Sequence, residues 1–206
     1  MKDIIDEIAK ARRELSESGD TKSASVRRRY DAAIEDVWDA CTDPERIGRW
    51  LLPVTGDFRV GGTYQLEGNA GGEILRCEPP SLLKITWVYG GNGSEVEVRL
   101  AQDGESTEFE LQHTATVPPE MWDKYGPGAV GVGWDLALLG LSLHLAGGAK
   151  IDESDFALTE EGRRFVTASS QAWGEAHQAA GATPDQAASA VRNTTTFYAP
   201  DEAPKT

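Results

Sequence analysis

Residues 95–115, EVEVRLAQDGESTEFELQHTA, decide the fold class because they contain two alternating runs separated by a turn. Alternation with a period of two places every second side chain of a strand on the same face. The apolar face of the first run holds Val96, Val98 and Leu100, and that of the second holds Phe109, Leu111 and His113. We therefore predict two antiparallel strands that share one apolar face.

The sequence before residue 95 has the same alternating pattern. Short alternating runs are separated by Gly, Asn, Pro and Asp, which is typical of an antiparallel meander. The predicted strands cover residues 58–60, 63–67, 72–77 and 83–89, and an earlier strand covers residues 26–30. Two short helices follow that first strand, one at residues 34–41 and one opened by Asp43 as the cap with Pro44 in its first turn.

The region after the meander is helical. A helical turn is expected at residues 118–125, followed by a glycine-rich joint and a long helix at 131–145 with an apolar stripe of Trp134, Leu138, Leu141 and Leu145. Thr159 and Thr183 are placed to cap two further helices, and Thr183 with Gln186 matches a capping box. At the other end of the chain, residues 2–16 have near-helical apolar spacing.

These elements predict three segments. Residues 1–22 form an N-terminal helical extension, residues 23–148 the main domain, and residues 149–206 a C-terminal helical extension. The extensions carry apolar side chains that need a partner surface, which is either the main domain or a second copy of the chain in a homodimer.

Composition narrows the classes of partner. The 206 residues carry a formal charge of −14, with a pI near 4.6, so the chain repels phosphate backbones and anionic lipid heads. We expect it to bind neither nucleic acid nor membrane, and we interpret residues 129–149 as a buried helix. Cys41 and Cys77 are isolated, and the N-terminus is too acidic for a signal peptide, so a cytoplasmic location is expected.

Motifs for cofactors and catalysis are unconvincing. Residues 126–131 match GxGxxG, but no strand pattern precedes them and no βαβ unit follows. Residues 140–144 resemble a nucleophile elbow only until His144 replaces the final glycine. The three histidines are too scattered to suggest a metal site. We therefore predict no cofactor and no metal.

An ordered set of residues resembles a known family. The set is Val37-Trp38-Asp39-Ala40, Thr42-Asp43-Pro44, Trp50, Gly61-Gly62, Gly72, Pro79-Pro80, Thr86-Trp87, Thr107, His113 and Gly133-Trp134. It is similar to the START-like or SRPBCC superfamily, in the branch related to activators of the 90-kDa heat-shock-protein ATPase. The resemblance implies an α+β helix-grip fold of the START-like, Bet v-like kind, in which a curved antiparallel sheet packs around a long C-terminal helix.

The superfamily also suggests a function. Its members bind lipids, polyketides, plant hormones or other hydrophobic ligands, and a few catalyse cyclisation or aromatase chemistry. Fold alone does not choose among these activities, and the resemblance transfers no catalytic residue to this chain.

Candidate ligand-binding residues are the aromatic and apolar side chains expected around a cavity between the sheet and the long helix. They are Trp50, Tyr64, Trp87, Phe109, Leu111, His113, Trp122, Trp134 and Leu138. For each of them, core packing is the competing interpretation. His113 is either a structural histidine or a polar group that orients a ligand. Trp122 and Tyr125 with residues 126–133 form either a hinged lid or a loop with a buried Trp.

Three functions follow from these observations. The leading hypothesis is binding of a hydrophobic or aromatic small molecule, with His113 as its polar contact. The second is a chaperone-associated interaction module. The third is a polyketide cyclase or hydratase, for which His113 is the acid–base candidate. The sequence favours binding over catalysis.

Overall fold

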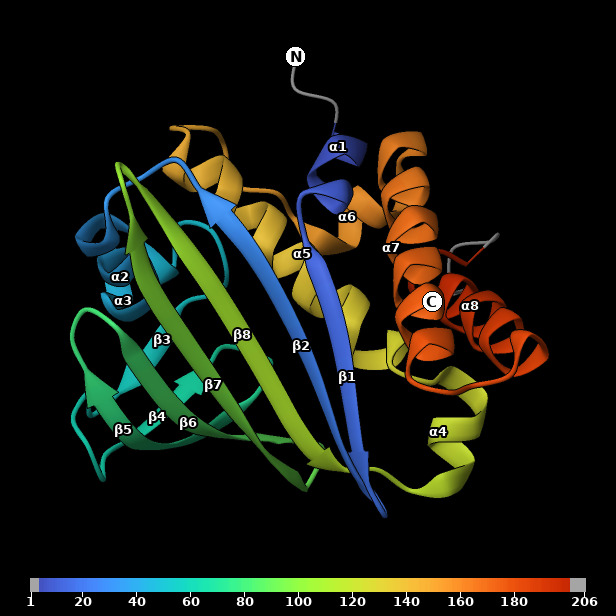
Figure 1. The fold of residues 1–206 in the computed structure, drawn as a ribbon. Helices are drawn as coiled ribbons and strands as arrows, with labels where there is room; N and C mark the ends of the chain where they lie inside the picture. Colours follow the sequence, from blue (N-terminus) through green and yellow to red (C-terminus); the bar gives the residue numbers. More distant parts are fainter. Residues whose placement is uncertain (1–3, 201–206) are drawn as a thin grey trace. The chain divides into compact units, whose positions relative to one another are not determined.

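The computed structural model describes residues 4–200 (Figure 1). Its internal contacts divide the chain into two compact units. The sheet unit comprises Ser25–Thr116 and Gly140–Lys150. Of the described residues, the helical unit comprises 4–24, Val117–Leu139 and 151–200. The N- and C-terminal segments therefore belong to the same compact unit, and the boundaries of a main domain at residues 23–148 stay a prediction.

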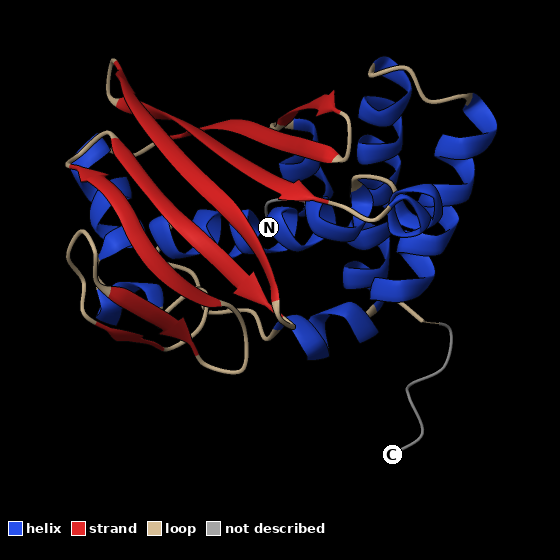
Figure 2. Cartoon of the chain, turned by 90° about the horizontal axis from the view of Figure 1, so that it is seen from below, coloured by secondary structure: helices blue, strands red, loops and turns tan. Residues whose placement is uncertain are grey.

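The strands form one curved antiparallel sheet (Figure 2). In chain order they are β1 (Arg12–Ser18), β2 (Thr21–Tyr30), β3 (Val54–Gly56), β4 (Thr63–Leu66), β5 (Gly71–Glu78), β6 (Leu82–Tyr89), β7 (Asn92–Asp103) and β8 (Ser106–Thr116). The spatial order is β1-β2-β8-β7-β6-β5-β4-β3. From β3 to β8 the strands are joined as consecutive antiparallel neighbours, which confirms the predicted meander.

The register of β7 against β8 confirms the predicted faces. Val96 pairs with His113, Val98 with Leu111 and Leu100 with Phe109. All six side chains are buried, whereas Glu95, Arg99 and Glu108 between them are exposed. Alternation alone was sufficient to assign these side chains to their faces, because one face of this hairpin is covered and the other is solvated.

The predicted strand at residues 58–60 is wrong. Phe58 and Val60 are 44% and 55% exposed and lie in the connection between β3 and β4. This connection is a tight turn in which the Gly62 amide donates to the Arg59 carbonyl and the Asp57 amide donates to the Thr63 carbonyl. Phe58 and Val60 alternate there without belonging to a strand, because the turn is closed by its own backbone hydrogen bonds and contacts the sheet through Gly61 and Gly62, which bond to Ile74 of β5.

The two short helices of the sheet unit are as predicted. They are α2 (Ile34–Thr42) and α3 (Pro44–Ile47), and Asp43 caps α3 by accepting a hydrogen bond from the Arg46 amide. Trp38 is buried on α2, as is common for a bulky indole on the apolar face of a helix.

The helical unit contains most of the remaining elements. They are α1 (Ile4–Ala9), α4 (Pro119–Tyr125), the first part of α5 (Gly128–Leu145), α6 (Glu153–Leu158), α7 (Glu160–Ala179) and α8 (Pro184–Tyr198). Thr159 accepts a hydrogen bond from the Gly162 amide, and Thr183 with Gln186 forms the complete capping box, so both predicted caps are confirmed.

The predicted N-terminal helix at residues 2–16 is wrong beyond Ala9. Residues 12–18 form β1, in which Arg13 and Leu15 are less exposed than their neighbours and alternate with them. This period of two was present in the sequence but was obscured by charged residues on both faces. Lys2, where the predicted helix began, lies outside the described residues.

The predicted glycine-rich joint is also wrong from Gly128 onward, because α5 begins there. A Cβ atom on Gly131 would lie 2.3 Å from the Trp173 ring, and one on Gly128 would lie 2.7 Å from Thr194. These glycines therefore allow α7 and α8 to approach α5 closely. The hinged-lid hypothesis loses its basis, because a helix packed at this distance does not act as a hinge.

Helix α5 has the length and hydropathy of a membrane span, with a mean hydropathy of 1.4. However, 56% of it is buried within the protein, and its Asp135 pairs with Arg13. These features are those of a core helix, which supports the interpretation of a buried helix for residues 129–145. Residues 146–149 follow the helix and are exposed, so the predicted helix was too long at this end.

Candidate functional site

One face of β6, β7 and β8 in the sheet unit is apolar. Leu83 pairs with Val98, Ile85 with Val96, and Trp87 with Ser94, so the face seen on β7 and β8 continues across β6. We call it the apolar sheet face; its members are Leu83, Ile85, Trp87, Ser94, Val96, Val98, Leu100, Phe109, Leu111 and His113.

Its two polar members are bonded to each other. His113 Nε2 lies 2.7 Å from Ser94 Oγ, and Ser94 Oγ donates to the Trp87 carbonyl at 2.9 Å. The rings of Trp87 and His113 meet edge to face with centroids 6.4 Å apart. His113 is 8% exposed, whereas Ser94 and Trp87 are half-buried. Along β7 this face is most exposed at Ser94, because Val96, Val98 and Leu100 are buried. We call the end at Ser94 the open end of the apolar sheet face.

Burial determines the charge of this pair. Removing the imidazole of His113 from water disfavours its charged form and lowers the pKa of His113 to about 4. His113 is therefore neutral at pH 7 and is a weak base there. The arrangement suits a hydrogen-bonding contact better than proton abstraction.

Tyr64 lies in a neighbouring cluster of the same unit. Its ring is buried with Leu66 and Ile74, and Trp87 packs against this cluster. Its hydroxyl donates to the Thr86 carbonyl at 2.7 Å, and burial raises the pKa of Tyr64. The structure thus brings three of the predicted candidates, Tyr64, Trp87 and His113, into one continuous region of the sheet unit. Their role in binding stays a prediction.

Trp50 and Phe109 have structural contacts. The indole Nε1 of Trp50 donates to the Ala40 carbonyl at 2.9 Å, and its backbone lies against Gly140. Phe109 meets Tyr30 edge to face at the opposite end of β8 from His113, with ring centroids 5.7 Å apart. For both residues the contacts favour core packing.

The remaining predicted residues lie in the helical unit. Trp122 packs edge to face against His177, and the ammonium of Lys22 lies over its ring at 5.1 Å. Trp134 is half-buried and Leu138 is buried on α5. Of the nine candidates, Trp122, Trp134 and Leu138 therefore belong to a different compact unit from the other six.

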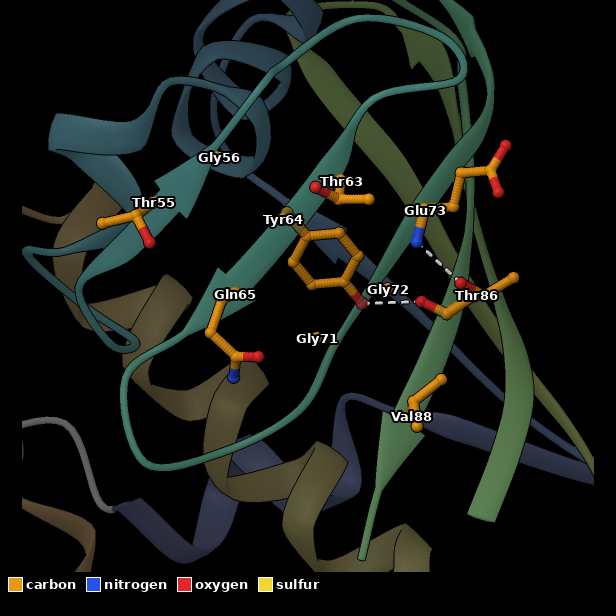
Figure 3. Close-up of a pocket in the computed structure, with 10 residues that line it drawn as sticks. All are labelled: Thr55, Gly56, Thr63, Tyr64, Gln65, Gly71, Gly72, Glu73, Thr86 and Val88. Atoms are coloured by element: carbon orange, nitrogen blue, oxygen red, sulfur yellow. Dashed lines mark hydrogen bonds between the residues drawn. The ribbon is translucent and has the colours of Figure 1, made fainter. Parts of the chain in front are cut away.

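A hollow of about 620 Å³ on β3 to β6 was not predicted (Figure 3). It is lined by Thr55, Gly56, Thr63, Tyr64, Gln65, Gly71, Gly72, Glu73, Thr86 and Val88. The Tyr64 ring reaches toward Thr86 from a position opposite Gly72, whose Cβ would lie 2.2 Å from the Thr86 carbonyl oxygen. The sequence signal for it was the Gly71-Gly72 pair, which marks close backbone approach.

The hollow on β3 to β6 is poor in side chains that could act as catalysts or metal ligands. Glu73 is the one carboxylate in its lining, and its amide donates to Thr86 Oγ1 at 2.7 Å. Across residues 4–200, no group of three or more His, Cys, Asp and Glu side chains is arranged to hold a metal ion. The apolar sheet face is therefore the stronger candidate site.

Comparisons with known proteins place this geometry in a family. No curated protein matched the sequence significantly. The crystal structure of CalU16 from Micromonospora echinospora is 39% identical, covers 82% of this chain and 97% of its own, and has a TM-score of 0.64. The solution structure of CalU16 is 38% identical, with coverages of 83% and 97% and a TM-score of 0.69.

A more distant structure supports the fold alone. DynU16, a protein in the dynemicin biosynthetic locus, is 20% identical over 62% of this chain and 48% of its own, with a TM-score of 0.56. The helix-grip fold predicted from the sequence is thus confirmed. Residues 31–146 match the family described as Activator of Hsp90 ATPase homolog 1-like protein. This match covers more than half of the chain, which therefore belongs to the Activator of Hsp90 ATPase homolog 1-like family.

Proposed function

We propose that the protein binds an apolar, aromatic small molecule at the open end of the apolar sheet face. The observation that carries the proposal is the His113–Ser94 pair, a neutral polar contact in otherwise apolar surroundings. Small-molecule sites commonly combine apolar walls with a few polar groups that fix orientation. Trp87 supplies an aromatic wall beside the pair.

Binding is better supported than catalysis. His113 is a weak base because burial lowers its pKa to about 4. Burial also raises the pKa of the Cys41 thiol to about 12, which keeps it in its unreactive protonated form. Neither group therefore favours the cyclase or hydratase hypothesis.

A fluorescent probe tests the proposal. N-phenyl-1-naphthylamine is neutral and aromatic, and its emission rises in apolar surroundings. We expect saturable binding to the intact chain and at least about fivefold weaker binding to Trp87→Leu, equivalent to ~1 kcal/mol. Val88→Ala is the matched control, because Val88 is the next residue on β6 but lines the hollow on β3 to β6. Thermal unfolding of both variants establishes that they are folded.

The two variants distinguish the two surfaces. Weaker binding by Trp87→Leu with unchanged binding by Val88→Ala supports the apolar sheet face. The reverse pattern moves the site to the hollow. Absence of saturable binding to the wild-type protein rejects the proposal.

A second candidate function follows from the family description, which names activation of an Hsp90 ATPase. On this hypothesis the protein contacts a chaperone. Its test is the ATPase rate of purified Hsp90 with and without the full chain. Stimulation, together with no probe binding, would favour the chaperone role over small-molecule binding.

A further inference from the structure

The two hydrogen bonds of the Ser94 hydroxyl assign the direction of the proton shared between Ser94 and His113. The Ser94 hydroxyl has one proton, and it is directed to the Trp87 carbonyl, which can only accept. The 2.7 Å contact between Ser94 Oγ and His113 Nε2 therefore has Nε2 as its donor. Neutral His113 then carries its proton on Nε2, and its Nδ1 is unprotonated.

This arrangement leaves Ser94 with acceptor capacity alone. Its oxygen has two lone pairs, one of which accepts from His113, and its own proton is already donated. Ser94 is also half-buried, whereas His113 is buried, so Ser94 is the member of the pair that a ligand at the open end can reach.

We infer that the site selects aromatic ligands that donate a hydrogen bond, such as phenols or aromatic N–H compounds, and rejects aromatic carboxylates. This inference rests on the proposed function and names its ligand class. A phenol proton matches the remaining lone pair of Ser94. A carboxylate has no proton to donate to that lone pair, so the two acceptors would face each other without a hydrogen bond. The carboxylate would also lose its hydration on burial. The overall charge of −14 opposes anions as well.

The proton arrangement is tested without any ligand. Long-range ¹H–¹⁵N NMR spectra of the histidine side chains distinguish the two neutral tautomers at pH 7. We expect His113 to show a protonated Nε2 and an unprotonated Nδ1, with its signals assigned from their loss in His113→Phe. A His113 protonated on Nδ1 instead would overturn the inference, because Ser94 would then have to donate to the ring.

The ligand class is tested with three matched naphthalenes at pH 7: neutral 2-naphthol, its methyl ether and the charged 2-naphthoate. Loss of one hydrogen bond should make 2-methoxynaphthalene bind about two- to tenfold more weakly than 2-naphthol. We expect 2-naphthoate to bind most weakly. Ser94→Ala should abolish the preference for 2-naphthol over its ether, and Ser94→Thr, which keeps a hydroxyl, should retain it.

The outcomes separate the two proposals. Tightest binding by 2-naphthoate, or a preference for 2-naphthol that persists in Ser94→Ala, overturns the inference and leaves the binding function intact. Failure of all three compounds and of N-phenyl-1-naphthylamine to bind overturns the proposed function, and this ligand class with it. Ser94→Thr is the conservative control for Ser94→Ala, because it changes the same residue and keeps the hydroxyl that contacts His113. A preference lost in Ser94→Ala but kept in Ser94→Thr therefore reports the hydroxyl rather than misfolding.

Discussion

Arg13 and Asp135 form a buried bidentate ion pair in the helical unit, although 122 residues separate them in the chain. Arg13 Nε donates to Asp135 Oδ2 at 3.1 Å, and Nη2 donates to Oδ1 at 3.0 Å. The two side chains are 5% and 3% exposed. Asp135 Oδ2 also accepts hydrogen bonds from Ser169 and Trp173 of α7. One carboxylate on α5 thus joins β1 to α7.

Removing the charge of Asp135 should strongly destabilise the protein. Asp135→Asn leaves the Arg13 guanidinium buried without its counter-charge, which typically costs about 3–5 kcal/mol. The free energy of unfolding from urea titrations measures this loss. Glu95→Gln is the control, because it breaks the more exposed Lys84–Glu95 pair and should cost at most about 1 kcal/mol. Equal small losses in both variants would show that the buried pair does not hold the helical unit together.

Gly131 is predicted to tolerate no side chain. Gly131→Ala would place a methyl group 2.3 Å from the Trp173 ring, so α5 and α7 must separate at a cost of about 1–3 kcal/mol. Gly48→Ala is the matched control, because its added Cβ would make only ordinary contacts at 3.6 Å and Gly48 has helical backbone angles. Thermal unfolding should show a lower Tm for Gly131→Ala than for Gly48→Ala. Equal Tm values would contradict the close packing of these helices.

His113 should make stability depend on pH. Its pKa is about 4 in the folded protein against 6.5 for an unperturbed histidine, so the unfolded chain binds more protons between these values. Stability is therefore complete above about pH 6.5 and is lost as the pH falls toward 4, by up to about 3 kcal/mol. Urea titrations between pH 7 and 4 should show a shallower loss for His113→Phe than for the wild type. Parallel losses would show that His113 is not neutral and buried.

The main features of the sheet were predictable from sequence because alternation and capping are local. The pattern at residues 95–115 gave the buried face of β7 and β8, and the caps at Asp43, Thr159 and Thr183 were confirmed. The Arg13–Asp135 pair was not predictable, because no local pattern encodes a contact between distant segments. The glycines of α5 suggested flexibility, and only the position of Trp173 shows that they serve close packing.

The candidate site was only partly predictable for the same reason. His113 was singled out because it interrupts an apolar strand face. Ser94 was missed because it follows the turn-like residues 90–93, and its face is set only by its register with Trp87. Trp122 was placed among the cavity-lining candidates, as part of a lid, because aromatic character in a sequence does not reveal which compact unit a side chain joins.

The most direct test of the proposed site is an NMR titration of the ¹⁵N- and methyl-labelled full chain with N-phenyl-1-naphthylamine. The account predicts saturable shift changes that are largest at the Trp87 indole N–H, the Val96 methyl groups and the His113 ring. Shifts that are largest at Thr55 and Val88 of the hollow, or in the helical unit, or the absence of saturable shifts, would contradict it.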